Sequence, residues 1–417
     1  MVSDFVGRNA PIRAPSPRPL TNTRTVPDVP MDYLLTEDQR MIRDLCRQIA
    51  EEKIKPVAAK YDESAEFAWD IVQVLAEADI FGVSIPVEYG GMGGGVLETA
   101  LVTEALSWGC GGIALAFGGT GLGTYPIVLF GNEEQKQRYL PPIARGETLA
   151  AFAITEADAG SDAARIRTTA IKHGDHYVLN GTKQWITNGG EAEVYTVIAL
   201  TDKGKGARGA SAFIVEKNTP GLAFGKKENK LGIRSSATRE VIFEDARIPE
   251  ANLLAREGMG FIVALKTFDH ARPGVAAQAV GIAQRALDEA THYARIRKQF
   301  GHPISSFQGI QFMLADMAIA VEASRALVYS AARMIDSGAK DIAKASAICK
   351  TFASDACMKV TVDAVQIFGG YGYMKEYPVE KLLRDAKITQ IYEGSNEIQR
   401  NVIAAQLLKE SAKGNWA

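Results

Sequence analysis

At residues 150–162 the chain reads AAFAITEADAGSD, and the spacing of its apolar residues changes there from a helical to an extended pattern. Similar short runs follow, rich in β-branched and aromatic residues and separated by turn formers such as Asn180-Gly181. Together these runs cover residues 150–155, 177–180, 184–187, 194–201, 210–215 and 241–243. We therefore expect an antiparallel sheet or a small barrel of roughly 100 residues.

Helical patterns flank this block on both sides. Thr36 and Gln39 predict a capping box at the start of the first helix. Further helices are predicted at residues 68–78, 97–108, 261–272, 275–298, 307–335 and 339–368, with Pro273 as a break. The expected fold class is α+β: an N-terminal α-helical domain at 31–149, a middle β domain at 150–255 and a C-terminal helical bundle at 256–417.

The composition is that of a globular protein, with 47% hydrophobic and 23% charged residues. A net charge of −2 favours neither nucleic acid nor a membrane surface, and we expect no apolar run of about 18 residues that would span a bilayer. The proline-rich residues 1–30 predict a disordered tail. Asp4 and Asp28 weigh against an organelle transit peptide, so a bacterial cytoplasmic location is favoured over the mitochondrial matrix.

The cysteines and histidines predict neither disulfides nor a metal site. The four cysteines form no CxxC pair, and the five histidines form no HExxH motif. This pattern indicates a reducing compartment, and any metal would have to be bound by carboxylates alone.

Two common catalytic motifs are excluded. Gly204, Gly206 and Gly209 match the letters G-x-G-x-x-G, but the run lies between two predicted strands and opens no helix, so we interpret it as a hairpin loop. The sequence contains no G-x-S-x-G motif, which would expose a nucleophilic serine. A nicotinamide-binding Rossmann enzyme and a serine hydrolase are therefore disfavoured.

Glu393 is the candidate catalytic residue in residues 366–400, QIFGGYGYMKEYPVEKLLRDAKITQIYEGSNEIQR. It lies between Tyr392, a flat side chain, and Gly394, which permits close approach to the backbone. Ser395 is the expected N-cap of a following helix, so the glutamate would lie at a helix N-terminus. It is a candidate general base, and the alternative is an ordinary surface glutamate.

Seven segments in this order resemble the acyl-CoA dehydrogenase family, and most closely its short- and medium-chain branch. The resemblance covers residues 33–408. The segments are AFAITEADAGSD (151–162), WITN (185–188), LGIRSSATR (231–239), DHAR (269–272), RKQFG (297–301), QIFGG (366–370) and YEG (392–394).

The resemblance implies three domains in the predicted order, with four helices in the last, and FAD as the cofactor. It implies that a neighbouring subunit contributes residues 366–370 to the same FAD, and so a homotetramer built as a dimer of dimers. For Trp185 the alternative is a place in the core. The implied cofactor-binding residues are Phe152, Ile154, Thr155, Gly160, Ser161, Trp185, Ile186, Thr187, Arg297, Gln299, Phe300, Phe307, Gln308, Gln366, Ile367, Phe368, Gly369, Gly370, Ser395, Asn396 and Glu397.

The resemblance also implies the reaction, which is α,β-dehydrogenation of an acyl-CoA thioester to the trans-2-enoyl-CoA. Glu393 would remove the α-proton, and the β-hydride would pass to flavin N5. One branch of the family places the base just before the arginine, but that position here is Ala271, which takes no proton. The implied substrate-binding residues are Ser161, Phe268, Asp269, Arg272, Tyr392, Gly394, Phe117, Gly118 and Gly274. For Asp269 and Arg272 the alternative is an ion pair in a helix bundle, and for Ser161 it is an ordinary loop serine.

The acyl group and the electron acceptor follow less directly. Gly118 and Gly274 leave width in the implied acyl pocket and Phe117 limits its depth, which favours a short, branched or cyclic acyl group over a long chain. The resemblance implies electron-transfer flavoprotein as acceptor. Two alternatives stay open: an acyl-CoA oxidase that uses O₂, and a non-catalytic acyl-CoA-binding scaffold of the same fold.

Overall fold

The N-terminal helices begin where the capping box predicts. The computed structural model describes residues 33–414, and the predicted tail at 1–30 lies outside them. Thr36 caps α1 (Glu37–Ile49): its hydroxyl accepts the Gln39 N–H at 3.2 Å, and the Gln39 side chain accepts the Thr36 N–H at 3.0 Å. The other helices of this block are α2 (Ala58–Ser64), α3 (Trp69–Glu77), α4 (Val96–Gly109), α5 (Gly111–Phe130) and α6 (Glu133–Ala144).

The helix α5 is the most apolar helix of this block. It is long and apolar enough to cross a membrane, so the expectation that no such run exists is wrong. In the structure 61% of its apolar window is buried, and it packs against α4, α7 and β1. At Gly123 the helix lies so close to the sheet that a Cβ would come within 2.4 Å of the Ala151 nitrogen. Burial in the core therefore accounts for the apolar character of α5.

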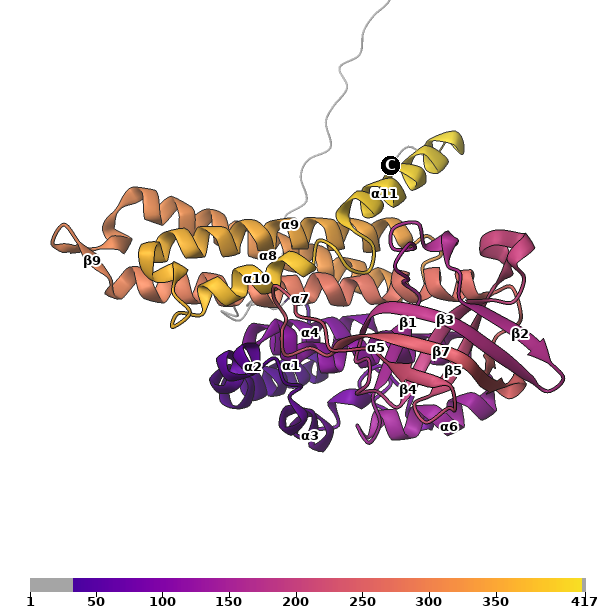
Figure 1. Cartoon of the computed structure of the whole chain (residues 1–417). Coiled ribbons are helices and arrows are strands. Elements are labelled where there is room, and N and C mark those ends of the chain that lie inside the picture. The colour runs from indigo at the N-terminus through magenta and orange to yellow at the C-terminus, as the bar shows by residue number, and fades with distance from the viewer. Residues whose placement is uncertain (1–32, 415–417) are drawn as a thin grey trace, which may run out of the picture. The chain divides into compact units, whose positions relative to one another are not determined.

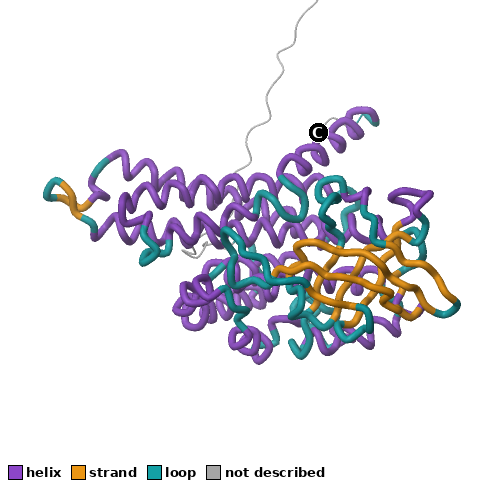
Figure 2. Tube along the Cα trace, viewed as in Figure 1, coloured by secondary structure: helices purple, strands orange, loops and turns teal. Residues whose placement is uncertain are grey.

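The strands β1 to β8 form one open, mixed sheet that is flanked by helices (Figure 2). Its order is β6-β7-β3-β2-β4-β5-β8, and β1 pairs with β4. Because β4 pairs parallel with β1 and β2, and β6 and β8 end the described sheet, the predicted antiparallel sheet or closed barrel is wrong in both respects. Parallel pairs need long connections, which short turn motifs do not reveal. The strands are β1 (Ala150–Ala153), β2 (Thr169–His173), β3 (His176–Thr187), β4 (Val194–Leu200), β5 (Ala210–Glu216), β6 (Leu222–Phe224), β7 (Thr238–Pro249) and β8 (Leu253–Leu254).

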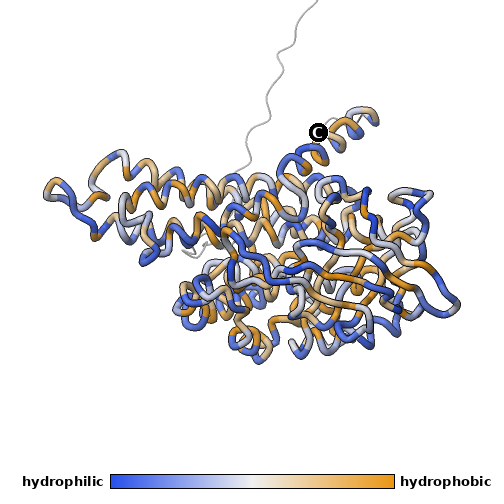
Figure 3. The backbone as a smooth tube through the Cα atoms, viewed as in Figure 1, coloured by the Kyte–Doolittle hydropathy of each residue, from blue (hydrophilic) through white to orange (hydrophobic). Residues whose placement is uncertain are grey.

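The single strand β3 replaces two predicted strands. Asn180-Gly181 was predicted as a turn, but the chain turns at Gly174, in a hydrophilic segment between β2 and β3 (Figure 3). Gly181 instead lies at a shift in the register between β3 and β7. The Asn180 side chain holds this bulge, since it donates to Asp245 Oδ1 at 3.0 Å and accepts the Asp245 N–H at 2.9 Å.

The C-terminal block consists of three long and two shorter helices (Figure 1). The helices α7, α8 and α9 pack against one another, and α10 and α11 both pack against α9. This arrangement has five helices, so the implied four-helix bundle is not confirmed in that form. The elements are α7 (Gly260–Ile296), α8 (Gln308–Asp336), α9 (Ala343–Phe368), α10 (Val379–Ile388) and α11 (Asn396–Ala412), with β9 (Lys298–Gln299) and β10 (His302–Pro303) forming a hairpin between α7 and α8.

Pro273 lies inside α7 and does not break it, contrary to the sequence expectation. A proline removes the hydrogen bond to the carbonyl four residues earlier, which is that of Asp269. The Ser346 hydroxyl of α9 donates to this carbonyl at 2.7 Å. A neighbouring helix therefore supplies the donor that the proline lacks, and α7 continues for 37 residues.

Candidate active site

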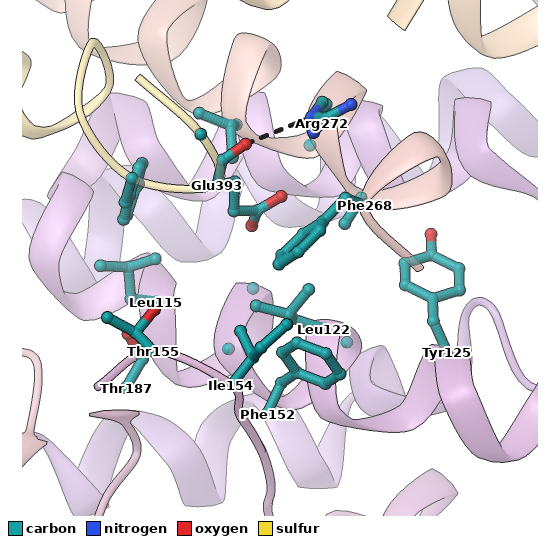
Figure 4. A pocket seen from close by; sticks show the side chains of 18 of the residues that line it. Leu115, Leu122, Tyr125, Phe152, Ile154, Thr155, Thr187, Phe268, Arg272 and Glu393 are labelled. Carbon is teal, nitrogen blue, oxygen red and sulfur yellow. Dashed lines mark hydrogen bonds between the residues drawn. The ribbon is translucent and has the colours of Figure 1, made fainter. Parts of the chain in front are cut away.

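A cavity of about 380 Å³ lies where the helical blocks meet the sheet (Figure 4). Its walls come from α4, α5, α7, the ends of β1 and β3 and the loop between α10 and α11. The structure thus brings together most of the residues predicted around Glu393. Those that line the cavity are Phe117, Gly118, Phe152, Ile154, Thr155, Gly160, Ser161, Trp185, Ile186, Thr187, Phe268, Arg272, Gly274, Tyr392, Glu393 and Gly394.

The carboxylate of Glu393 points into this cavity (Figure 4). Its Oε2 is buried and has no hydrogen-bond partner among the described residues. Burial raises the pKa of the Glu393 carboxyl to about 7, and the nearby charges of Arg272 and Lys350 oppose this rise. A carboxylate of near-neutral pKa that faces a cavity is suited to general-base catalysis, and the alternative of an ordinary surface glutamate is wrong.

The backbone that carries Glu393 is held in a rare conformation. Glu393 and Gly394 have φ values of +52° and +90°, and the left-handed region is costly for a glutamate. The Glu393 carbonyl accepts from Arg272 Nε at 3.2 Å and Gln399 Nε2 at 3.1 Å. The Gly394 carbonyl accepts from Gln399 Nε2 and from Lys350 Nζ, both at 2.9 Å. These bonds fix the direction in which the Glu393 side chain projects.

Trp185 lies on another wall of the cavity. A second register shift between β3 and β7 leaves it with φ +56°, and its side chain is turned out of the strand with 57% of the residue exposed. The alternative of a core tryptophan is therefore wrong. Thr155 and Thr187 line the same cavity. A flat indole beside two hydroxyl groups fits the ring system of a flavin, which needs an apolar face and hydrogen-bonding groups at its edge.

A buried ion pair supports the segment that carries Thr155. Lys183 Nζ donates to Glu156 Oε1 at 2.7 Å and to the Ile154 carbonyl at 3.0 Å. Burial lowers the pKa of Lys183 to about 8, and the Glu156 charge opposes this shift. The Thr155 carbonyl accepts the Gln184 N–H at 2.8 Å. Residues on both sides of Thr155 are thus anchored to β3.

A second pocket, near the end of α7, collects other predicted cofactor residues. Because α7 rises about 1.5 Å per residue, Arg297 lies roughly 35 Å from Gly274 of the first cavity. Phe300 is 91% exposed and contacts the Phe307 ring. Gln308 is the first residue of α8, and Gln366 is exposed near the end of α9. The predicted residues lining this pocket are Arg297, Gln299, Ile367, Phe368, Gly369 and Gly370.

Arg297 and Gln299 share this pocket with residues of the 366–370 segment. The resemblance implies that residues 366–370 come from a neighbouring subunit, and residues 367–370 line the pocket together with Arg297 and Gln299. The α7 segment from Gln278, which lines the first cavity, to Arg297 spans roughly 29 Å.

Eight predicted residues line neither pocket: Phe300, Phe307, Gln308, Gln366, Asp269, Ser395, Asn396 and Glu397. Asp269 is buried, and its carboxylate lies 3.4 Å from Arg272 Nη1, which supports the ion-pair alternative for this residue. Ser395 is the N-cap residue of α11, as expected, but its side chain makes no capping bond. Asn396 is buried beneath the Glu393 loop, and Glu397 is exposed.

Sequence reasoning missed several lining residues. Thr99, Thr103 and Ser107 recur every four residues on one face of α4 and line the cavity, and this spacing was the available signal. Gln278 of α7 lines it as well; its amide donates to the Gly111 carbonyl at 2.9 Å and its oxygen accepts from the Tyr392 hydroxyl. No local motif marks Gln278, because its partners are far away in the sequence.

Residues 33–414 contain no group of three or more His, Cys, Asp or Glu side chains placed to hold a metal ion. The four cysteines are buried and free.

Comparison with known proteins identifies the family. The acyl-CoA dehydrogenase N-terminal, middle and C-terminal domains match residues 36–147, 151–246 and 258–408. An acyl-CoA dehydrogenase of Bacillus subtilis is 50% identical over 90% of this chain and 99% of its own length. A short-chain-specific acyl-CoA dehydrogenase of Clostridium acetobutylicum is 46% identical over 91% of this chain and all of its own length. The chain belongs to the acyl-CoA dehydrogenase family, a family of flavoprotein oxidoreductases.

Solved structures give the same result. Butyryl-CoA dehydrogenase of Megasphaera elsdenii has a TM-score of 0.88 and 46% identity, over 91% of this chain and all of that chain. A chain from a study of the electron transferring flavoprotein of Acidaminococcus fermentans has a TM-score of 0.89 and 49% identity with the same coverage. An acyl-CoA dehydrogenase of Bacillus anthracis complexed with FAD has a TM-score of 0.86 and 38% identity, over 92% of this chain and 69% of that chain.

Proposed function

We propose that this protein is an FAD-dependent dehydrogenase that converts a short acyl-CoA thioester to the trans-2-enoyl-CoA, with Glu393 as the base. The observation that carries the proposal is the Glu393 carboxylate. It is desolvated, has a pKa of about 7, and projects into a cavity that Thr155, Trp185 and Thr187 also line. Family membership supports the reaction class.

The chemistry required of Glu393 fits its surroundings. The α-proton of a thioester is weakly acidic, so its removal needs a base of adequate pKa and stabilisation of the charge that develops on the thioester oxygen. The desolvated carboxylate provides the base, and we assign the Glu393 backbone N–H to the thioester oxygen. Arg272, which is buried beside the cavity, would contact the CoA portion.

The cofactor would be held by two copies of the chain. The Trp185 wall would flank the isoalloxazine ring, and when bound FAD supplies the acceptor for the β-hydride. Arg297 and the adjacent glycines at 369 and 370 would reach the pyrophosphate region from a neighbouring copy, since a guanidinium suits a diphosphate and glycines allow close approach. The FAD-bound relative supports this cofactor, and we infer a homotetramer in which paired copies complete the sites.

The proposed electron acceptor is electron-transfer flavoprotein. The similar chain from the study of that flavoprotein in Acidaminococcus fermentans supports this choice. Peroxide formation during turnover would instead identify an oxidase, and a purified protein without flavin would support the scaffold alternative. A bacterial cytoplasmic location stays a prediction, which the four free, buried cysteines support.

The cavity favours a wide, short acyl group. A Cβ added at Gly121 or Gly274 would meet no atom within 4 Å, and one at Gly118 would meet only Leu115 at 3.7 Å, so these positions leave width. Phe117 is buried against Phe81 and closes the wall. We expect isobutyryl-, butyryl- or cyclohexanecarboxyl-CoA to give a higher kcat/KM than octanoyl-CoA. A clear preference for octanoyl-CoA would contradict this part of the proposal.

The test of the base is Glu393→Gln. The variant keeps the shape of the side chain but removes the proton acceptor, so we expect unchanged flavin content and a fall in kcat of about 10³-fold or more. The exposed Glu376 provides the control, Glu376→Gln, which should turn over normally. If Glu393→Gln retained more than about a tenth of the wild-type rate, the assignment would be wrong.

A further inference from the structure

Lys350 of α9 is a lysine buried directly beneath the catalytic loop. Its exposure is 0%, and its ammonium donates to the Gly394 carbonyl and to Asn396 Oδ1, both at 2.9 Å. The Asn396 amide in turn donates to Ser354 Oγ and to Asp355 Oδ1, both at 2.8 Å. The ammonium is therefore held by the loop between α10 and α11 and by Asn396 of α11, which is itself bonded to α9.

Burying an ammonium group is unfavourable, so a buried lysine at this position suggests that its positive charge has a function. Desolvation lowers the pKa of Lys350 to about 8, and the Glu393 carboxylate is the largest opposing influence. A neutral donor could satisfy the Gly394 carbonyl without this penalty. What a neutral donor would lack is the positive charge next to the base.

The charges around Glu393 are few and come from several elements. Arg272 on α7 and Lys350 on α9 both lower the proton affinity of the carboxylate, against its desolvation. Asp269 partly neutralises Arg272, to which it is paired. On the Lys350 side, Asp355 of α9 and Glu397 of α11 supply negative charge, and Arg400 pairs with Asp355. Lys350 is thus one of two cations that favour the ionised base.

The hydrogen bond made by Lys350 also acts on the strained turn. Glu393 and Gly394 are consecutive left-handed residues, and Lys350 holds the second of their two carbonyls. Gln399 bonds both carbonyls and Arg272 bonds the first, so three side chains hold these two groups. Removing Lys350 leaves the turn two donors but takes away the buried charge at its C-terminal side.

We propose that Lys350 is a positioning residue for the base: its ammonium holds the turn at Glu393 and Gly394 and favours the ionised form of the Glu393 carboxylate. The inference deepens the proposed function, on which its kinetic part rests. Lys350 touches neither reacting atom of the substrate. Its effect would pass through the orientation and the proton affinity of Glu393.

The kinetic test compares Lys350→Met with Lys350→Arg in the flavin-loaded enzyme. Without the cation, the acid limb of the profile of log(kcat/KM) against pH should move up by about one pH unit, with the flavin absorbance unchanged. Lys350→Arg keeps the charge and should return the limb toward its wild-type position. Lys350→Gln, a neutral donor, should shift the limb as Lys350→Met does. The exposed Lys359 on the same helix gives the control Lys359→Met, with no shift expected.

A second measurement needs no turnover. At about pH 7.5, between the pKa of about 7 for Glu393 and that of about 8 for Lys350, the thermal midpoints of wild type, Lys350→Met, Glu393→Gln and the double variant form a cycle. Lys350→Met should lower the midpoint more when residue 393 is glutamate than when it is glutamine, because only the glutamate carries a charge. If wild type turned over no acyl-CoA, the proposed function would fail, yet the cycle would still decide this inference.

Three outcomes would overturn the inference. The first is an unshifted acid limb in Lys350→Met and Lys350→Gln. The second is additivity in the thermal cycle. The third concerns the case in which neither neutral variant folds but Lys350→Arg does. If the acid limb of Lys350→Arg is then displaced from its wild-type position, keeping the positive charge has failed to preserve the protonation behaviour of Glu393.

Discussion

Glu393 combines two features that oppose folding, a left-handed backbone and a desolvated carboxylate. Its neighbours compensate in specific ways: Arg272, Gln399 and Lys350 hold the carbonyls, and two of these side chains bring positive charge. The buried carboxylate oxygen Oε2 has no hydrogen-bond partner among residues 33–414. If both carboxylate oxygens of Glu393 accepted hydrogen bonds, the carboxyl would have a lower pKa and would remove a weakly acidic proton less readily.

The raised pKa of Glu393 makes a prediction for stability. With a pKa of about 7 in the folded state and about 4.5 when unfolded, the folded protein binds the proton more tightly. The penalty for burying the carboxylate is therefore absent below about pH 4.5, grows as the pH rises to 7, and stays constant above it, at no more than about 3 kcal/mol.

Glu393→Gln should remove this penalty, so its thermal midpoint should exceed that of wild type at pH 8, and the difference should disappear toward pH 4.5. Thermal unfolding followed at several pH values measures the effect. A variant that is less stable than wild type at pH 8 would show that burial does not raise the pKa of this carboxyl.

The N-terminus of α4 is capped by a side chain of α8, a helix that is distant in the sequence. Gly95 precedes α4 and has no side chain to cap it. The Asp336 carboxylate at the end of α8 accepts the N–H groups of Val96 at 2.7 Å and Leu97 at 2.9 Å. A negative charge at a helix N-terminus is stabilising, so Asp336 both caps α4 and fixes the wall of the cavity to the C-terminal helices.

Asp336→Ala should lower the free energy of unfolding by about 1–2 kcal/mol, because two backbone donors lose their acceptor. Asp316 is exposed on the same helix, so Asp316→Ala is the matched control and should leave the thermal midpoint unchanged. Equal midpoints for the two variants would mean that this cap contributes nothing.

The elements also show what could be predicted from the sequence. Periodicity and the Thr36 capping box gave the α, β, α order, because these signals depend on neighbouring residues. Pro273 and Asn180 were interpreted wrongly because their outcome depends on Ser346 and Asp245, which lie in other elements. The cavity residues carried by ordered motifs were found, whereas Lys350 and Gln278 were missed since only tertiary packing brings them to Glu393.

On the scale of the whole chain, most of the predicted cofactor-binding residues fall into two separate pockets. Arg297 and Gln299 lie in one pocket, and Trp185 and Glu393 line the other. Along α7, Gln278 of the first pocket and Arg297 of the second are roughly 29 Å apart. In the proposed homotetramer, the Arg297 end of one copy would approach the Trp185 wall of another.

Arg297→Ala should then lose at least about half of its flavin on gel filtration, because a guanidinium that bonds the pyrophosphate is gone. Its catalytic cavity should stay intact, so added FAD should restore turnover at a higher concentration than wild type requires. The neighbouring, exposed Arg295 provides the control Arg295→Ala, which should retain its flavin. Wild-type flavin retention by Arg297→Ala would exclude this role.

Because α7 continues through Pro273 without a break, the chain should tolerate insertions in some places and not in others. Each residue of a helix turns the chain by about 100°. A single insertion between Gly274 and Arg297 would therefore rotate the far end of α7 and everything attached to it by more than a quarter-turn. Insertions in surface turns such as the one at Gly174 disturb only their surroundings. In α7 the number of residues must stay constant, because it sets the orientation of one end of the helix relative to the other.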